Sequence, residues 1–136
     1  MSAWIGELGA KAGPLAVAAL RFQTTPRFVR GDHATCLHAG AAGIRQIAEV
    51  TETWLAHESA TDEDESSFVE GIGAWLGLVL IAALDGQHMA RDGAHRERLG
   101  AYGFFDPFAA MEAVLDADQP RQELARQLRR TPVGNE

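Results

Sequence analysis

The apolar residues of this chain concentrate in one stretch, residues 68–84, which reads FVEGIGAWLGLVLIAAL. Its large apolar side chains follow helical spacing on one side and fill most of the opposite side, which is typical of a helix buried all round. Thr61 is a good N-cap residue, and the acidic residues 62–65 suit the positive end of a helix dipole. The stretch is several residues too short to cross a bilayer of about 30 Å as a helix. We therefore predict a central helix buried inside a soluble fold.

Three glycines, Gly71, Gly73 and Gly77, interrupt this apolar stretch. Each one costs a helix about 1 kcal/mol relative to alanine. Their presence is tolerable if a neighbouring element passes close to the helix, so we predict close packing at these positions.

Helical periodicity also appears in five shorter segments, at residues 2–11, 15–22, 41–57, 108–117 and 120–130. A proline precedes or opens three of them, as is common at the first helical position. Asp106 and Asp118 are the predicted N-caps of the last two segments. Residues 26–40 show no sustained period, so we expect an extended or irregular segment there.

A β-hairpin is predicted after the central helix, because Asp92-Gly93 favours a two-residue type I′ turn. Pairing across this turn divides the side chains between two faces. One face holds Gln87, Met89, Arg91, Ala94, Arg96 and Arg98, and the other holds His88, Ala90, His95, Glu97 and Leu99. The face with three arginines suits water, so we expect the second face to lie against the helices. Two strands alone are marginally stable, and we expect a third strand from residues 26–38.

Three motifs follow one another along the chain: GIGAWLGLVL, DGQHMARDG and FFDPFAAMEAVLDA. An acidic stretch before a glycine-rich apolar helix, then a short hairpin and an F-x-P-F helix start, resembles a loose group of uncharacterised bacterial α+β domains. In that group the helix often reads G-A-Y-L-G-E-V, the first strand G-G-R-W and the last helix start F-P-F. Here Trp75 stands at the helix aromatic, His88 stands roughly where the strand tryptophan would be, and Asp106 is inserted before the proline. The resemblance covers about residues 41–118 and implies a bacterial α+β fold, but no activity.

Length and composition are those of one soluble domain. At 136 residues the chain can bury a core, and we predict a mostly helical α+β domain over residues 1–130, with a flexible tail at 131–136. In this domain a small antiparallel hairpin or sheet packs on the central helix.

The formal charge of −7 disfavours binding to nucleic acids or anionic membranes. The single cysteine cannot form an internal disulfide, and the first residues lack the basic segment of a signal peptide, so we expect a cytoplasmic protein.

The segment DHATCLH, residues 32–38, contains residue types that bind zinc or act as nucleophiles. His33, Cys36 and His38 offer borderline and soft metal ligands, and histidines beside a thiolate can activate it. Their spacing matches no standard zinc site, and a fourth ligand would have to come from another histidine or an acid. Cysteine is more often a small buried hydrophobe. We therefore favour an ordinary cysteine with surface histidines, and we predict no metal and no cofactor.

A second candidate site lies on the inner hairpin face, which carries His88, His95 and Glu97. The predicted register makes His88 and Glu97 cross-strand neighbours, and a carboxylate beside a histidine is the usual way to orient a base. Polar cross-strand pairs also stabilise sheets without any catalytic role. We favour the structural interpretation of this pair.

A third candidate is a basic surface formed by six arginines: Arg91, Arg96, Arg98, Arg126, Arg129 and Arg130. Guanidinium groups can bind an acidic partner or a phosphate through paired hydrogen bonds. A solvated face is the simpler interpretation of the same residues.

We predict a non-enzymatic protein-interaction or regulatory module, because no complete catalytic set is visible and the basic hairpin contrasts with the acidic body. The expected partners are other proteins, including a second copy of the chain. The expected binding residues are His88, Arg91, His95, Arg96 and Arg98. Two alternatives stay open. One is a small metal-dependent or cysteine/histidine enzyme that uses residues 32–38 with a hairpin histidine, and the other is a small-ligand binder with a pocket near Trp75 and Phe104.

Overall fold

The computed structural model describes residues 3–56, 61–91, 94–99 and 103–131. Within these residues the chain forms six α-helices, two short 3-10 helices and one three-stranded antiparallel sheet. The helical elements are α1 (Ala3–Leu8), η1 (Gly9–Ala12), α2 (Leu15–Gln23), η2 (Gly31–Ala34), α3 (Gly40–Leu55), α4 (Asp62–Leu84), α5 (Pro107–Asp116) and α6 (Pro120–Arg129). The strands are β1 (Gln87–Arg91), β2 (Ala94–Arg98) and β3 (Phe104–Phe105). The predicted α+β fold, mostly helical with a small sheet and a central buried helix, is confirmed.

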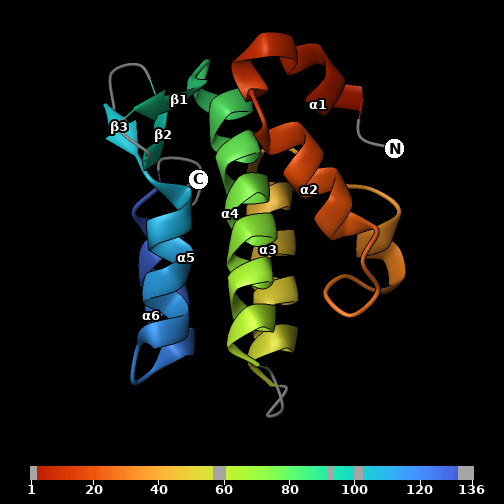
Figure 1. Cartoon of the computed structure of the whole chain (residues 1–136), viewed down its shortest axis with the longest axis vertical. Coiled ribbons are helices and arrows are strands. Elements are labelled where there is room, and N and C mark those ends of the chain that lie inside the picture. The colour runs from red at the N-terminus through yellow and green to blue at the C-terminus, as the bar shows by residue number, and fades with distance from the viewer. Residues whose placement is uncertain (1–2, 57–60, 92–93, 100–102, 132–136) are drawn as a thin grey trace.

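The long helix α4 runs through the middle of the molecule, with α2 on one side, α5 on the other and α3 behind it (Figure 1). Its predicted N-cap is confirmed, because the Thr61 hydroxyl accepts a hydrogen bond from the Asp64 amide at 3.1 Å. Every residue of α4 from Gly71 to Ile81 is buried. The helix ends at Asp85, which adopts the left-handed conformation with φ 51°. The other elements therefore assemble around this one helix.

Among the described helices, α4 is the one that is long and apolar enough to cross a membrane, with 23 residues and a mean hydropathy of 1.9 in its most apolar window. The sequence predicts that the apolar stretch of residues 68–84 is too short to span, but the helix itself begins at Asp62, ahead of that stretch, and is therefore longer. In the structure 67% of that window is buried by the rest of the chain. This burial matches the core helix of a globular fold.

The predicted close packing at the glycines of α4 is confirmed by the side chains that fill the space beside them. A Cβ at Gly71 would overlap the Phe22 side chain of α2, and a Cβ at Gly73 would lie 2.7 Å from the Phe108 ring of α5. At Gly77 the nearest atom would be Leu15 Cδ1, at 3.0 Å. These glycines therefore set how closely α2 and α5 approach α4.

An aromatic cluster joins α2, α3 and α4 around the N-terminal part of α4. Trp54 stacks on Phe68 with ring centroids 4.8 Å apart, and Phe28 stacks on Phe22 at 5.3 Å. Phe28 also contacts both Trp54 and Phe68 edge-on. Aromatic pairs of this kind contribute about 0.5–1.5 kcal/mol each beyond their burial. The cluster anchors the irregular segment that contains Phe28 to the core.

The sheet has the strand order β1-β2-β3, and the hairpin register is the one predicted from the sequence, with Gln87 opposite Arg98 and His88 opposite Glu97. The turn residues themselves lie outside the described residues. The prediction of a third strand from residues 26–38 is wrong, because β2 pairs instead with β3. Next to this pair of strands, the Leu99 amide donates to the Gly103 carbonyl at 2.7 Å. A nearby segment therefore occupies this edge.

Two details of the helices differ from the sequence predictions. The segment predicted as one helix over residues 2–11 is α1 followed by η1, because Gly9 adopts a positive φ of 56° that ends the α-helix. The predicted N-cap of α5 is confirmed, since Asp106 accepts from the Ala109 amide at 3.0 Å. The N-cap of α6 is Gln119 rather than the predicted Asp118, and it makes no side-chain cap bond.

Candidate functional site

The segment with His33, Cys36 and His38 does not gather its three candidate ligands. Cys36 Sγ lies 3.9 Å from His38 Nδ1, but His33 Nε2 faces Glu49 on α3 at 3.0 Å. Among the described residues there is no group of three or more histidine, cysteine, aspartate or glutamate side chains placed to hold a metal ion. The enzyme hypothesis that rests on this segment therefore lacks a third ligand there.

The backbone of this segment is held on both sides by buried or half-buried side chains. Gln46 of α3 donates to the Cys36 carbonyl at 2.7 Å and accepts from the His38 amide at 2.8 Å. From the other side, the Trp4 indole N–H donates to the Leu37 carbonyl at 2.7 Å. These bonds give the segment a structural role, since they attach a non-regular stretch to α3 and α1.

His88 and Glu97 form the predicted cross-strand pair, with His88 Nδ1 and Glu97 Oε1 2.9 Å apart. The exposed fractions of the two side chains are 4% and 0%. Burial lowers the pKa of His88 below its usual value, which favours a neutral imidazole at pH 7. A hydrogen bond to a carboxylate favours the tautomer with the proton on Nδ1. The pair therefore has the geometry of an oriented base.

The surroundings of this pair leave little room for a substrate. A Cβ at Gly13 would lie 2.9 Å from His88 Cδ2, so the link between η1 and α2 covers the imidazole. A Cβ at Gly77 would lie 3.5 Å from Glu97 Cδ, so α4 covers the carboxyl group. The geometry is that of a buried polar contact that fixes the sheet to α4 and to the N-terminal helices.

The predicted basic surface is placed in part. Arg96 and Arg98 are exposed on β2, as expected for the outer face of the hairpin. The side chains of Arg91 and His95 lie outside the described residues. On α6 the Arg126 guanidinium binds Glu123 through two hydrogen bonds of 2.9 and 2.7 Å. These bonds, together with one from Gln127, lower the pKa of that carboxyl group to about 2. This ion pair offsets one of the six positive charges of the predicted surface.

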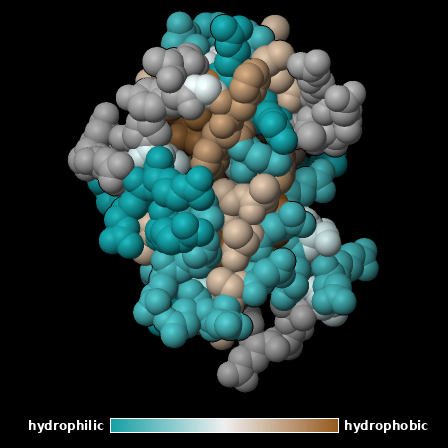
Figure 2. Space-filling view, turned by 90° about the vertical axis from the view of Figure 1, so that its left-hand side faces the viewer, coloured by the Kyte–Doolittle hydropathy of each residue, from teal (hydrophilic) through white to brown (hydrophobic). Residues whose placement is uncertain are grey.

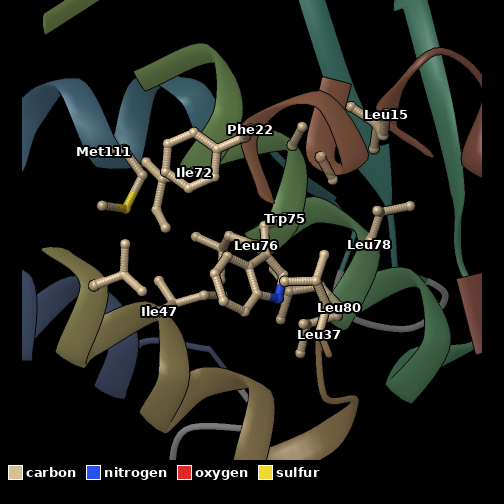
Figure 3. Packing of buried hydrophobic residues seen from close by; sticks show 14 of the residues in the cluster. Leu15, Phe22, Leu37, Ile47, Ile72, Trp75, Leu76, Leu78, Leu80 and Met111 are labelled. Atoms are coloured by element: carbon tan, nitrogen blue, oxygen red, sulfur yellow. The ribbon is translucent and has the colours of Figure 1, made fainter. Parts of the chain in front are cut away.

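The pocket expected near Trp75 and Phe104 is not formed by these two residues. Trp75 is completely buried between α3 and α4, where Leu37, Ile47 and Leu80 surround it (Figure 3). Its indole N–H has no hydrogen-bond partner among the described residues. Phe104, by contrast, is 61% exposed on β3. A tryptophan that fills the core cannot line an open pocket.

A groove that was not predicted from the sequence lies between α2 and α4 and extends to the start of α5. It has two lobes, of about 600 and 240 Å³, and Ala18, Arg21 and Glu70 line both. The larger lobe is completed by Pro14, Leu15, Val17 and Phe108. The smaller lobe is completed by Phe22, Thr25, Arg27, Phe28, Ser67 and Gly71. We call this surface the α2–α4 groove, and its larger lobe is mostly apolar.

The outer face of α2 borders this groove and carries apolar residues that no described element covers. Val17 is 60% exposed and Leu20 is 40% exposed, and with Arg21 and Thr24 they follow the i, i+3, i+4, i+7 spacing of one helix face. The sequence contained a signal for this face. Residues 15–22, LAVAALRF, are apolar on more sides than a helix needs when it buries one face.

The side of the molecule that carries the sheet, α5 and α6 presents a different surface. Figure 2 shows an apolar stripe that runs down this side, where the sheet, α5 and α6 lie, with polar residues on both borders. The cavity found here is lined mostly by polar and charged residues of α6, such as Gln122, Glu123, Arg126 and Arg129. The cavity along α6 is therefore more polar than the larger lobe of the α2–α4 groove.

The chain matches no protein-family model, no curated protein and no solved structure.

Proposed function

We propose that this chain is a non-enzymatic protein-interaction or regulatory module of a bacterial cytoplasm, and that it binds its protein partner through the α2–α4 groove. The observation that carries the proposal is the exposed apolar face of α2 beside the apolar lobe of the groove. Exposed apolar surface next to a hollow is typical of interaction sites on soluble proteins.

The groove suits recognition of a protein segment such as a helix. A helix laid into an apolar groove is a common mode of recognition and uses anchors at i, i+3, i+4 and i+7. Burying the exposed parts of Val17, at 60%, and Leu20, at 40%, would contribute roughly 1 kcal/mol for each side chain. These two side chains are therefore expected to supply apolar contact area at the interface.

The other candidate sites support a catalytic role less well. The oriented base His88 is enclosed together with Glu97, and within the described part of the chain no third side chain joins Cys36 and His38 in a metal-binding group. A catalytic base must reach the proton that it removes, within about 3 Å or through one water. The arrangement of these side chains favours the interaction hypothesis over the enzyme hypothesis.

The experiment compares two apolar-to-acidic substitutions on opposite sides of α4, Val17→Asp and Phe104→Asp. Both residues are about 60% exposed, which makes the second variant a matched control for added charge and lost apolar area. Quantitative cross-linking and affinity capture should show one specific protein complex that Val17→Asp abolishes and Phe104→Asp retains. Circular dichroism of both variants checks that each is folded. If Phe104→Asp abolishes the complex and Val17→Asp retains it, the sheet side is the interface and the proposed groove is wrong.

A further inference from the structure

We propose that the partner in the α2–α4 groove is a second copy of this chain, held in a two-fold symmetric dimer. This inference rests on the proposed function and names its partner. In a two-fold interface the same patch is used by both copies, so the patch must be complementary to itself. The α2–α4 groove meets this condition in its charges and in its shape.

The charges are opposite and lie at the centre of the groove. Arg21 and Glu70 each line the two lobes of the groove, so these residues lie where the lobes join. Both side chains are exposed, and neither forms an ion pair with another described residue. A two-fold axis through this centre places Arg21 of one copy opposite Glu70 of its partner, and the same contact occurs a second time.

The shape is also self-complementary. The exposed face of α2 supplies an apolar ridge, Val17 and Leu20, next to a lobe of about 600 Å³. Ala18, at the centre of the groove, is small enough to let two α2 helices approach at the 8–10 Å that is usual for packed helices. Each copy then contributes a ridge and receives one, so both apolar faces are covered at once.

The balance of charges favours this partner over a strongly acidic or basic peptide. Arg21 and Glu70 are the charged groups that line both lobes. Arg27, which lines the smaller lobe, is already paired with Asp64 at 2.7 Å, so a peptide of a single charge sign would gain one contact at the centre and meet one repulsion there. The formal charge of −7 also makes two copies repel each other at long range. The measurements should therefore be made at about 0.15 M salt, where charges are screened beyond about 8 Å.

The test uses charge reversal at the two central positions and multi-angle light scattering on the full chain. R21E places two acidic groups in each patch and E70R places two basic groups, so each variant alone should dimerise at least about tenfold more weakly than the wild type. An equimolar mixture of R21E and E70R should form a heterodimer, because all contacts between the two variants are then attractive. The double variant R21E/E70R should dimerise again by itself. Circular dichroism confirms that each surface variant is folded.

The outcomes separate this inference from the proposed function. A mixture of R21E and E70R that stays monomeric, or single variants that dimerise like the wild type, would overturn the two-fold dimer. If the wild type is a monomer but Val17→Asp still loses a complex with another protein, the second copy is wrong as the partner and the interaction module stands. If Val17→Asp changes neither self-association nor any other complex, both proposals fail.

Discussion

Gly71→Ala tests how closely α2 packs on α4. A Cβ at this position would overlap Cδ1, Cγ and Cβ of Phe22. Because the overlap includes the Phe22 Cβ, rotation of the ring cannot remove it, and α2 has to move away from α4. Phe22 also stacks on Phe28 and contacts Phe68 edge-on, so this movement disturbs the aromatic cluster as well.

The magnitude follows from two opposing effects. Overpacking a core costs about 1–3 kcal/mol. The helix preference of alanine over glycine offsets about 1 kcal/mol of this cost. Since the overlap with Phe22 also displaces its aromatic neighbours, we expect the upper half of the packing range and a net loss of about 1–2 kcal/mol. For a domain of this size the loss corresponds to a fall in Tm of about 3–8 °C.

The assay is urea unfolding followed by circular dichroism, with Gly6→Ala as the matched control. Gly6 lies in the exposed part of α1, and a Cβ there would meet nothing within 4 Å. Gly6→Ala should therefore raise the free energy of unfolding by up to about 1 kcal/mol. Combining Gly71→Ala with Phe22→Leu should cost less than the sum of the two single changes. A Gly71→Ala variant as stable as the wild type, or additive effects of the two changes, would show that α2 does not pack tightly against Gly71.

Three further predictions concern single side chains of the core and its edges. Lowering the pH from about 7 to about 5 should destabilise the wild type more than the His88→Gln variant. Burial lowers the pKa of His88 below 6.5, so His88 binds its proton more readily in the unfolded chain than in the folded one. Equal dependence of the free energy of unfolding on pH in the two proteins would refute this. Gln46→Ala removes the side-chain hydrogen bonds to the Cys36 carbonyl and the His38 amide, and it should lower the free energy of unfolding in urea by about 2 kcal/mol or more. The His38 amide should also exchange faster with solvent, and unchanged exchange would contradict the structural role of Gln46. Thr61→Ala removes the α4 N-cap and should cost about 1 kcal/mol, whereas Thr61→Ser should cost much less; equal losses in the two variants would argue against the cap.

The sequence by itself determined the features that depend on residues close together in the chain. The apolar run of residues 68–84 and the cap at Thr61 specify α4, because helix burial and capping are read from spacing over a few turns. The hairpin register follows from Asp92-Gly93 in the same way, since a two-residue turn sets which residues face each other. The resemblance to bacterial α+β domains agrees with this fold and stays a prediction about relatedness.

The tertiary structure alone decided which distant segments meet. Residues 26–38 were free to become a strand by their pattern, but Phe28 is held in the aromatic cluster and β3 occupies the edge of β2. His33 contacts Glu49 rather than Cys36. The α2–α4 groove lies between two helices that are far apart in the sequence. Such contacts depend on how whole elements pack in space, and the spacing of residues within one element carries no information about the neighbour that it will meet.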